Sequence, residues 1–268
     1  MPFLKWVGGK GAIAEQILER LPEHIEDYCE PFLGGGSILE ALLESGSLRG
    51  RVVVGDLNRK LIDTYLAVKN DVEQLIADLE TVSADVTEEG YYKARTLFNT
   101  APTPALFIYL NKVGFRGLYR ENASGVFNVP YGHYKNPTVF DAGYLRRLSG
   151  LYNAHKVSFV CTTWQETVKS LTKKSVVYLD PPYVKLLATT FTEYSAGGFG
   201  DAASNDLINW MKTSEAFILY SNHATTEMVG LLQGWNVHTF EARRAIHSKD
   251  PSSTAAEILA SNKRKSIA

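Results

Sequence analysis

Asp180, Pro181, Pro182 and Tyr183 directly follow the apolar residues 176–179, and these residue types in this order could support chemistry. The apolar run predicts a buried strand. Because neither proline can donate a backbone hydrogen bond, the strand is expected to end there. Ligands of open α/β sheets bind at the carboxyl ends of the strands. A carboxylate, backbone carbonyls and an aromatic ring are therefore expected to meet in a binding site.

Such a set of groups suits the alkylation of an exocyclic amine on a nucleobase. That amine is a poor nucleophile, because its lone pair is delocalised into the ring. A carboxylate and a carbonyl that accept its two N–H bonds would favour the pyramidal, nucleophilic form, and a stacked aromatic ring would hold the base in place. The same residues also fit a tight proline turn with Tyr183 in the core, so the other motifs must decide.

Two glycine-rich turns, at residues 8–9 and 34–36, each precede a stretch with helical periodicity. At the second turn, Ser37 and Glu40 predict a capping box. The free N–H groups at the start of a helix bind anions. Neither the G-x-G-x-x-G pattern nor the lysine of a P-loop is present in the second turn. The pattern therefore favours a ligand with a small anionic end, such as the carboxylate of an amino acid, over a dinucleotide or a triphosphate.

Residues 51–56 predict a second strand, which ends in Asp56. This acid follows the second glycine turn by about 20 residues, the spacing at which an acid binds ribose hydroxyls in dinucleotide-binding folds. An ordinary helix cap is the alternative. The glycine turn before it favours ribose binding.

A mostly helical insertion interrupts the alternation of strands and helices. Its predicted bounds are 59–156, which leaves residues 1–58 and 157–268 as one discontinuous domain. Within it, residues 114–135 alternate glycine, asparagine, aromatic residues and arginine without helical periodicity, which predicts a hairpin or loop. Residues 112–156 contain seven Lys or Arg and two Asp or Glu, a net charge of +5 in a chain of net charge −1. This charge fits either a nucleic-acid contact or a solvated basic loop.

The composition sets outer limits on the function. The chain has 268 residues, of which 45% are hydrophobic and 21% charged, which suits one large domain with a smaller insertion. Cys29 and Cys161 are too few for a disulfide scaffold or a structural zinc site, and favour a reduced cytoplasmic, nucleoid or nuclear setting. No apolar run approaches the roughly 20 residues of a membrane span, and the first residues lack a signal-peptide core. Residues 185–205, with three glycines, predict a lid loop.

Several motifs together resemble the Dam family, the class D12, α-order DNA adenine-N6 methyltransferases. They occur in the family's order across nearly the whole chain, at residues 5–10, 30–37, 56–58, 117–122, 127–130 and 180–183. The resemblance implies an α/β fold of the class I SAM-dependent methyltransferase type, with a Rossmann-like mixed sheet and an inserted, mainly helical target-recognition domain. It implies S-adenosyl-L-methionine as methyl donor, no metal, and double-stranded DNA as substrate. Recognition of GATC and flipping of the target adenine follow from the same resemblance.

The resemblance also implies roles for individual residues, carried over by position. The catalytic set is Asp180, Pro181, Pro182 and Tyr183. The donor-binding set is Trp6, Lys10, Phe32, Gly34, Gly36, Asp56 and Asp180. The DNA-binding set is Arg116, Leu118, Arg120, Asn122, Pro130, Tyr134 and Lys135. Arg116 stands where the family commonly has Asn, so the contact made there is expected to differ.

The amine chemistry leaves alternatives open. Methylation of cytosine at N4 uses the same groups, and an RNA adenine is another acceptor. A catalytically dead DNA-binding regulator is the alternative from a different class, and Lys10, Asp56 and Asp180 argue against it. A cognate restriction endonuclease is a possible partner, a membrane is not, and the expected oligomeric state is a monomer or weak dimer.

Overall fold

The computed structural model describes residues 3–182, 201–243 and 254–263. Its centre is a seven-stranded sheet with the order β3-β2-β1-β4-β5-β7-β6. The first five strands of this order pair in parallel, whereas β7 is antiparallel to both β5 and β6. The strands are β1 (Ile25–Glu30), β2 (Leu48–Asp56), β3 (Ser158–Cys161), β4 (Ser175–Leu179), β5 (Phe217–His223), β6 (Asn236–Arg243) and β7 (Thr254–Ser261). The predicted mixed α/β sheet is therefore confirmed.

The central strands are apolar throughout because both faces of the sheet are covered. Every residue of β4 is buried. Side chains alternate between the faces of a strand, so Val176 and Tyr178 pack into one core while Val177 and Leu179 pack into the other. This double burial explains why the sequence around the site is a continuous apolar run rather than an alternating one.

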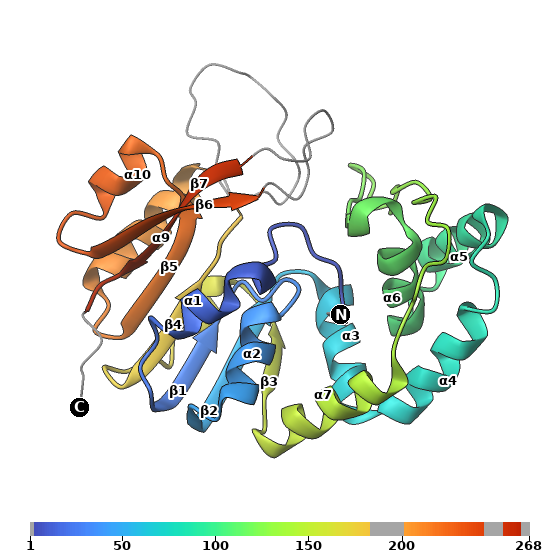
Figure 1. Cartoon of the computed structure of the whole chain (residues 1–268), viewed down its shortest axis with the longest axis horizontal. Coiled ribbons are helices and arrows are strands. Elements are labelled where there is room, and N and C mark those ends of the chain that lie inside the picture. Colours follow the sequence, from blue (N-terminus) through green and yellow to red (C-terminus); the bar gives the residue numbers. More distant parts are fainter. Residues whose placement is uncertain (1–2, 183–200, 244–253, 264–268) are drawn as a thin grey trace.

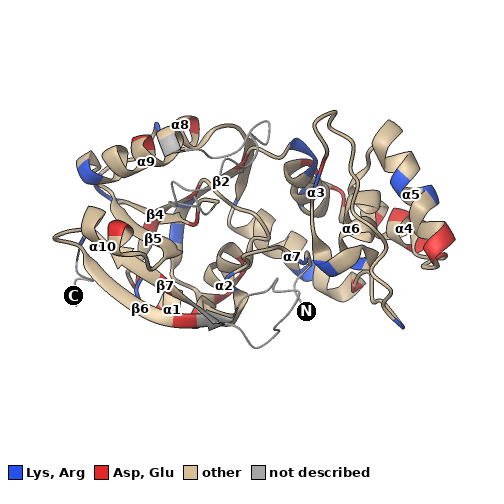
Figure 2. Ribbon diagram, turned by 90° about the horizontal axis from the view of Figure 1, so that it is seen from above, with Lys and Arg blue, Asp and Glu red and all other residues tan. Residues whose placement is uncertain are grey.

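Helices cover both faces of this sheet. The first core includes residues of α1 (Ala14–Leu18), α2 (Ser37–Ser45) and α3 (Arg59–Asn70). The second core includes residues of α8 (Trp164–Thr167), α9 (Asp201–Thr213) and α10 (Thr226–Leu231). Figure 2 shows α8 and α9 on one side of the sheet and α1 and α2 on the other.

A second, helical lobe lies beside the sheet (Figure 1). It contains α4 (Val72–Val82), α5 (Glu88–Thr100) and α6 (Pro104–Val113), and α3 and α7 (Ala142–Ala154) lie between it and the sheet. Thr103 caps α6, with Pro104 in the first turn, which is the usual pattern at the start of a helix. All residues of α6 from Ala105 to Val113 are buried, so this helix is the core of the lobe. The predicted domain bounds at 58/59 and 156/157 stay a prediction.

Two local predictions were wrong. The cap of α2 is Gly36, in the left-handed region at φ +68°, and Ser37 is already helical. Glu40 does not close a capping box, because its buried carboxylate accepts a hydrogen bond from the Tyr144 hydroxyl at 2.6 Å. The carboxyl bound predicted for the lid loop, residue 205, was wrong, since residues 201–205 belong to α9. Residues 183–200 lie outside the described chain.

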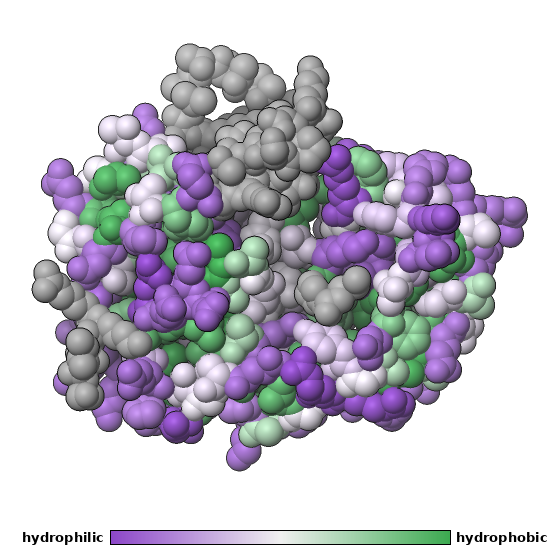
Figure 3. All heavy atoms as spheres, in the orientation of Figure 1, coloured by the Kyte–Doolittle hydropathy of each residue, from purple (hydrophilic) through white to green (hydrophobic). Residues whose placement is uncertain are grey.

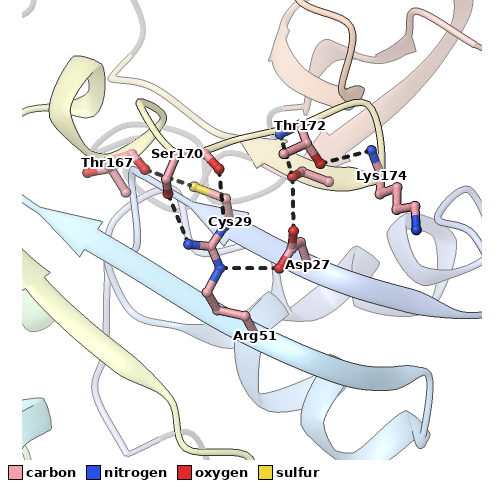
Figure 4. A network of polar contacts seen from close by, with 8 residues as sticks. Asp27, Cys29, Arg51, Thr167, Ser170, Thr172 and Lys174 are labelled. Atoms are coloured by element: carbon pink, nitrogen blue, oxygen red, sulfur yellow. Dashed lines mark hydrogen bonds and ion pairs between the residues drawn. The ribbon is translucent and has the colours of Figure 1, made fainter.

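A polar network fixes the amino-terminal edge of the sheet (Figure 4). Arg51 of β2 donates to Asp27 of β1 at 3.2 Å and to the hydroxyl and carbonyl of Ser170 at 3.1 and 3.2 Å. Ser175, the first residue of β4, lies 3.5 Å from the second oxygen of Asp27. These contacts hold β1, β2 and β4 at the edge opposite to their carboxyl ends.

Candidate active site

Three acids lie at the carboxyl edge of the sheet. Glu30 and Asp56 are the last residues of β1 and β2, and Asp180 follows the last residue of β4. Because these strands are parallel neighbours, their carboxyl ends meet at one edge. The strand end that Pro181 and Pro182 predicted lies where it was expected.

Lys10 lies at the centre of this edge. Its Nζ atom lies 2.9 Å from Asp180 Oδ1 and donates a hydrogen bond to the carbonyl of Gly8 at 3.0 Å. Glu257 Oε2 of β7 is 4.0 Å from the same nitrogen. The side chains of Lys10 and Asp180 are only 5% and 19% exposed, so the ion pair is largely removed from water and its mutual attraction is strong. The structure thus brings together two residues predicted for the site.

Burial changes the proton affinity of these acids. It raises the pKa of Asp180 above its ordinary value, while the nearby Lys10 ammonium opposes the rise. Burial raises the pKa of Glu30 to about 8, although the Tyr28 hydroxyl stabilises the carboxylate with a hydrogen bond of 2.9 Å. The negative charge of Asp180 adds to the rise at Glu30. Near neutral pH, a pKa of about 8 favours the protonated form of Glu30, whereas the Lys10 ammonium at 2.9 Å favours the ionised form of Asp180.

Asp56 is oriented by the backbone of the glycine turn. Its Oδ2 accepts the Gly34 N–H at 3.1 Å, and its Oδ1 accepts the Asn58 N–H at 2.9 Å. Burial raises the pKa of Asp56, and these backbone N–H groups oppose the rise. A carboxylate has about four acceptor sites, and the N–H groups of Gly34, Leu57 and Asn58 take three of them, so Asp56 can accept a further hydrogen bond from a ligand hydroxyl.

The glycines of the second turn are required by two aromatic side chains. A Cβ on Gly34 would lie 2.8 Å from the Trp6 ring, and one on Gly35 would lie 2.6 Å from Trp6 Cβ. A Cβ on Gly36 would lie 2.5 Å from the Tyr65 hydroxyl, which itself donates to the Gly34 carbonyl at 2.9 Å. Trp6 therefore lies directly on the glycine turn, next to Asp56. Phe32, before this turn, packs on the core of the other sheet face.

The DNA-binding residues predicted from the sequence lie together in an irregular hairpin. Isolated bridges pair Gly114 with Tyr131 and Glu121 with Phe127, which confirms a hairpin without regular strands. Figure 3 shows hydrophilic side chains over much of the helical lobe that carries it. The predicted residues are exposed at Arg116, Arg120, Asn122, Pro130 and Lys135, and partly buried at Leu118 and Tyr134.

Several of these side chains already have partners within the hairpin. Arg120 Nε donates to Asn128 Oδ1 at 2.7 Å, which fixes the direction of the guanidinium. Asn122 Oδ1 accepts the N–H groups of Ser124 and Val126, both at 3.0 Å, so this asparagine shapes the turn. Arg120 Nη2 also donates to the Asn128 carbonyl at 3.5 Å, so the side chains of both Arg120 and Asn122 make hydrogen bonds within the hairpin.

Arg116 has an unusual backbone. Its φ is +55°, in the left-handed region that asparagine tolerates better than arginine. The Arg116 N–H donates to the Tyr134 hydroxyl at 3.0 Å, and its guanidinium lies 5.2 Å from the ring centre of Phe115. Strained residues of this kind concentrate at functional sites. Arg116, where the resemblance led us to expect a contact different from that of the family, is thus a strained, exposed arginine.

Sequence reasoning did not single out four polar residues, of which three are buried and Glu257 is partly buried. Asn111 and Lys112 lie in α6, and Ser221 and Glu257 lie on β5 and β7 beside Asp180. The sequence does contain a signal for Asn111 and Lys112, because these two polar residues interrupt an otherwise apolar helix. The positions of Ser221 and Glu257 depend on strand pairing over long separations in sequence.

The described residues also contain a cavity away from the site, but neither a metal-binding cluster nor a membrane-spanning helix. A cavity of about 420 Å³ is lined by residues that precede β4 and β5, among them Thr172 and Ala216, and so lies far from Asp180. In the described residues, no group of three or more His, Cys, Asp or Glu side chains is arranged to hold a metal ion. None of the helices in the described ranges is long and apolar enough to cross a membrane.

The fold and the site define a class of enzyme. A seven-stranded sheet with an antiparallel β7 between β5 and β6, and acids at its carboxyl edge, is the architecture of class I S-adenosylmethionine-dependent methyltransferases, which confirms the predicted fold class. The chain belongs to the D12 class of N6 adenine-specific DNA methyltransferases, a family that matches residues 6–246. It is therefore an adenine-specific DNA methyltransferase by family, as the motifs predicted.

Named relatives support this membership over most of the chain. The type II methyltransferase M.MjaIII of Methanocaldococcus jannaschii is 36% identical over 272 residues, which cover 92% of this chain and 93% of that protein. The type II methyltransferase M1.LlaDCHI of Lactococcus lactis subsp. cremoris is 31% identical, covering 97% and 95%. The DNA adenine methylase of Haemophilus influenzae is 35% identical, covering 93% and 88%.

Proposed function

We propose that the protein transfers a methyl group from S-adenosyl-L-methionine to N6 of an adenine that is flipped out of double-stranded DNA, within the sequence GATC. The donor supplies a methyl group that a neutral amine can attack. The protein supplies orientation and hydrogen bonds, and needs no metal.

The observation that carries this proposal is the position of Asp180. It lies at the carboxyl end of β4, it is largely buried, and its charge is maintained by Lys10 at 2.9 Å. An ionised acid there accepts an N–H from the target amine, which keeps the nitrogen lone pair available for attack. Tyr183, proposed to stack on the base, lies outside the described residues.

The described residues fit the donor. Asp56 offers lone pairs to ribose hydroxyls beside Trp6 and the glycine turn. Glu257 Oε2 is buried without a hydrogen-bond partner among the described residues, and the Ser221 hydroxyl lowers the pKa of Asp180 through a hydrogen bond, so both are polar groups close to Asp180. Buried polar atoms of this kind are usually satisfied by a ligand or water. These groups would hold the ribose and the polar, amino-acid end of the donor.

The hairpin is the proposed DNA contact. Arg120 is exposed and bonds to Asn128 through Nε and Nη2, and its remaining N–H donors suit a contact to a guanine in the major groove. Lys135 is exposed at the far end of the segment and suits a phosphate. The strained Arg116 makes a contact that differs from that of the asparagine common in the family. GATC as the target rests on the resemblance and on the relatives named DNA adenine methylase.

The experiment that tests this proposal is transfer of a labelled methyl group to unmethylated plasmid, with mapping of the labelled base. We expect label at adenine N6, confined to GATC. Label at cytosine N4 would show that the protein methylates cytosine rather than adenine. Label in RNA but not in DNA would show that the substrate is RNA. Binding to DNA without any transfer would favour a regulator.

A cognate restriction endonuclease is a proposed partner, since two relatives are named type II methyltransferases. A monomer or weak dimer and a cytoplasmic or nucleoid location complete the proposal.

A further inference from the structure

Asn111 joins two segments that lie far apart in the sequence. Its Oδ1 accepts the Lys5 N–H at 2.8 Å, and its Nδ2 donates to the Lys5 carbonyl at 2.6 Å and to the Gly117 carbonyl at 3.2 Å. The residue is 4% exposed. All of these partners are backbone groups, so the amide holds the path of the chain on both sides.

Each of the two segments leads directly to one half of the proposed site. Lys5 precedes Trp6, which lies on the glycine turn, and the same segment continues to Lys10 beside Asp180. Gly117 lies between Arg116 and Leu118 in the proposed DNA contact. Asn111 thus lies between the donor half and the DNA half without belonging to either.

The two segments are also packed with little free space. Gly117 has φ +66°, and a Cβ on it would lie 2.3 Å from Lys5 Cβ. Lys5 Nζ donates to the Lys112 carbonyl at 2.9 Å and lies 4.0 Å from the ring centre of Tyr134. In Figure 1 the N-terminal segment passes between the sheet and the helical lobe. A displacement of the hairpin turn therefore has to displace Lys5, and with it Trp6.

We propose that Asn111 is a positioning residue that couples DNA recognition to donor binding. The coupling rests on the proposed function, because it needs both ligands. When DNA fixes the turn at residues 116–118, the amide of Asn111 fixes Lys5 and Trp6, and the glycine turn meets the donor in its binding geometry. Linkage requires the reverse as well, so that the donor tightens DNA binding by the same factor.

The measurement is a coupling factor. The dissociation constant of S-adenosylhomocysteine, a donor analogue that cannot transfer a methyl group, is determined by calorimetry without DNA and with a saturating duplex that contains one GATC. The coupling factor is the ratio of the two constants, and we expect at least about fivefold for the unaltered protein.

Two variants break the link in different ways. Asn111→Ala removes all three hydrogen bonds, and Gly117→Ala keeps the Asn111 side chain but places a Cβ 2.3 Å from Lys5 Cβ, which forces Lys5 away. We expect both to bring the coupling factor close to one. The matched control is Asn262→Ala, because Asn262 Oδ1 accepts the Ile218 N–H at 2.9 Å and its Nδ2 donates to the Ala216 carbonyl at 2.8 Å, before and at the start of β5. It should destabilise the fold and leave the coupling factor unchanged.

A second readout uses the unaltered protein alone. Binding of S-adenosylhomocysteine without DNA should slow amide hydrogen exchange in residues 114–119, which lie outside the proposed donor site. Unchanged exchange there, or a coupling factor that survives in Asn111→Ala, overturns the inference. If the unaltered protein binds analogue and duplex independently, the coupling fails while the proposed function stands. If it does not bind the analogue at all, the proposed function fails first.

Discussion

Lys10 and Asp180 form a largely buried ion pair, 2.9 Å from nitrogen to oxygen, that joins the N-terminal segment to the carboxyl end of β4. The pair lies among further acids, Glu30 and Glu257, so Lys10 is the cation that keeps Asp180 charged. Removal of either partner would leave the other charge buried alone, which is costly. Substitution of either residue is therefore expected to lower both the stability of the fold and the rate of methyl transfer.

Asp180→Ala is expected to lower kcat roughly 10²- to 10³-fold or more, because the target amine loses its charged acceptor. The initial rate of labelled methyl transfer gives the loss, and circular dichroism checks the fold. Asp27→Ala is the control, since Asp27 is a carboxylate at the opposite edge of the same sheet, bound to Arg51. Near-normal turnover in a folded Asp180→Ala protein would contradict the assigned role.

Gly35→Ala is expected to weaken donor binding by about 1–3 kcal/mol, the usual cost of an overpacked position. The added methyl group would lie 2.6 Å from Trp6 Cβ and would push that ring off the glycine turn. Calorimetric titration of the donor measures the change. Gly150→Ala in α7 is the control, because a Cβ there has nothing within 4 Å and should stabilise the helix by about 0.5–1 kcal/mol. Equal donor affinity in the two variants would argue against a donor contact at Trp6.

Glu30→Gln is expected to make stability less dependent on pH. Burial raises the pKa of Glu30 to about 8, whereas an unfolded glutamate has a pKa of about 4.3. Between these values the folded state holds a proton that the unfolded state has released, so stability is highest below the unfolded pKa and falls as pH rises towards 8. Glutamine cannot ionise, and its carbonyl still accepts from Tyr28. In the variant, the fall in the free energy of unfolding should be smaller by up to about 1.4 kcal/mol for each pH unit between these two pKa values.

Urea unfolding at about pH 5 and about pH 8 measures this difference. A smaller fall should remain in the variant, because burial also raises the pKa of Glu40 to about 7. Parallel pH profiles for the variant and the unaltered protein would show that Glu30 is ionised in the folded state.

Arg120→Ala and Lys135→Ala are expected to change DNA recognition in different ways, the first in sequence preference and the second in overall affinity. Loss of a bidentate guanine contact should relax the preference at one base pair by roughly 1–3 kcal/mol. Loss of a phosphate contact should weaken all sequences about equally and reduce the salt slope by about one unit. Initial rates on the site and on each single-base variant, at two salt concentrations, separate these outcomes. If Arg120→Ala lowers every rate by one factor, Arg120 holds the backbone and Arg116 becomes the candidate for base reading.

The strands at the site could be predicted because their signals are local. The apolar run before Asp180 had to be a strand buried on both faces, and two prolines had to end it. Thr103 and Pro104 marked the start of α6 in the same way. The capping box failed because Glu40 has a stronger partner in Tyr144, a contact between elements that the local pattern does not contain.

The contacts that assemble the site could not be predicted from periodicity or spacing. The pairing of Lys10 with Asp180 depends on the path of the N-terminal segment across the sheet edge. The hydrogen bonds of Asn111 depend on two loops that meet only in the folded chain. In the sequence, this asparagine is visible only as a polar residue on an apolar helix.

The position of the N-terminal segment has a consequence for the order of folding. Phe3 and Leu4 are buried, yet the partners of this segment in α6 and at Asp180 are made much later during synthesis. Phe3 can pack against Tyr65 of α3 early in synthesis, since their ring centres lie 5.2 Å apart, whereas the pair of Lys10 with Asp180 cannot form until the ribosome has released β4. Contacts between such distant parts of a chain slow folding. The N-terminal segment therefore gains its full set of native contacts only after both lobes have been synthesised.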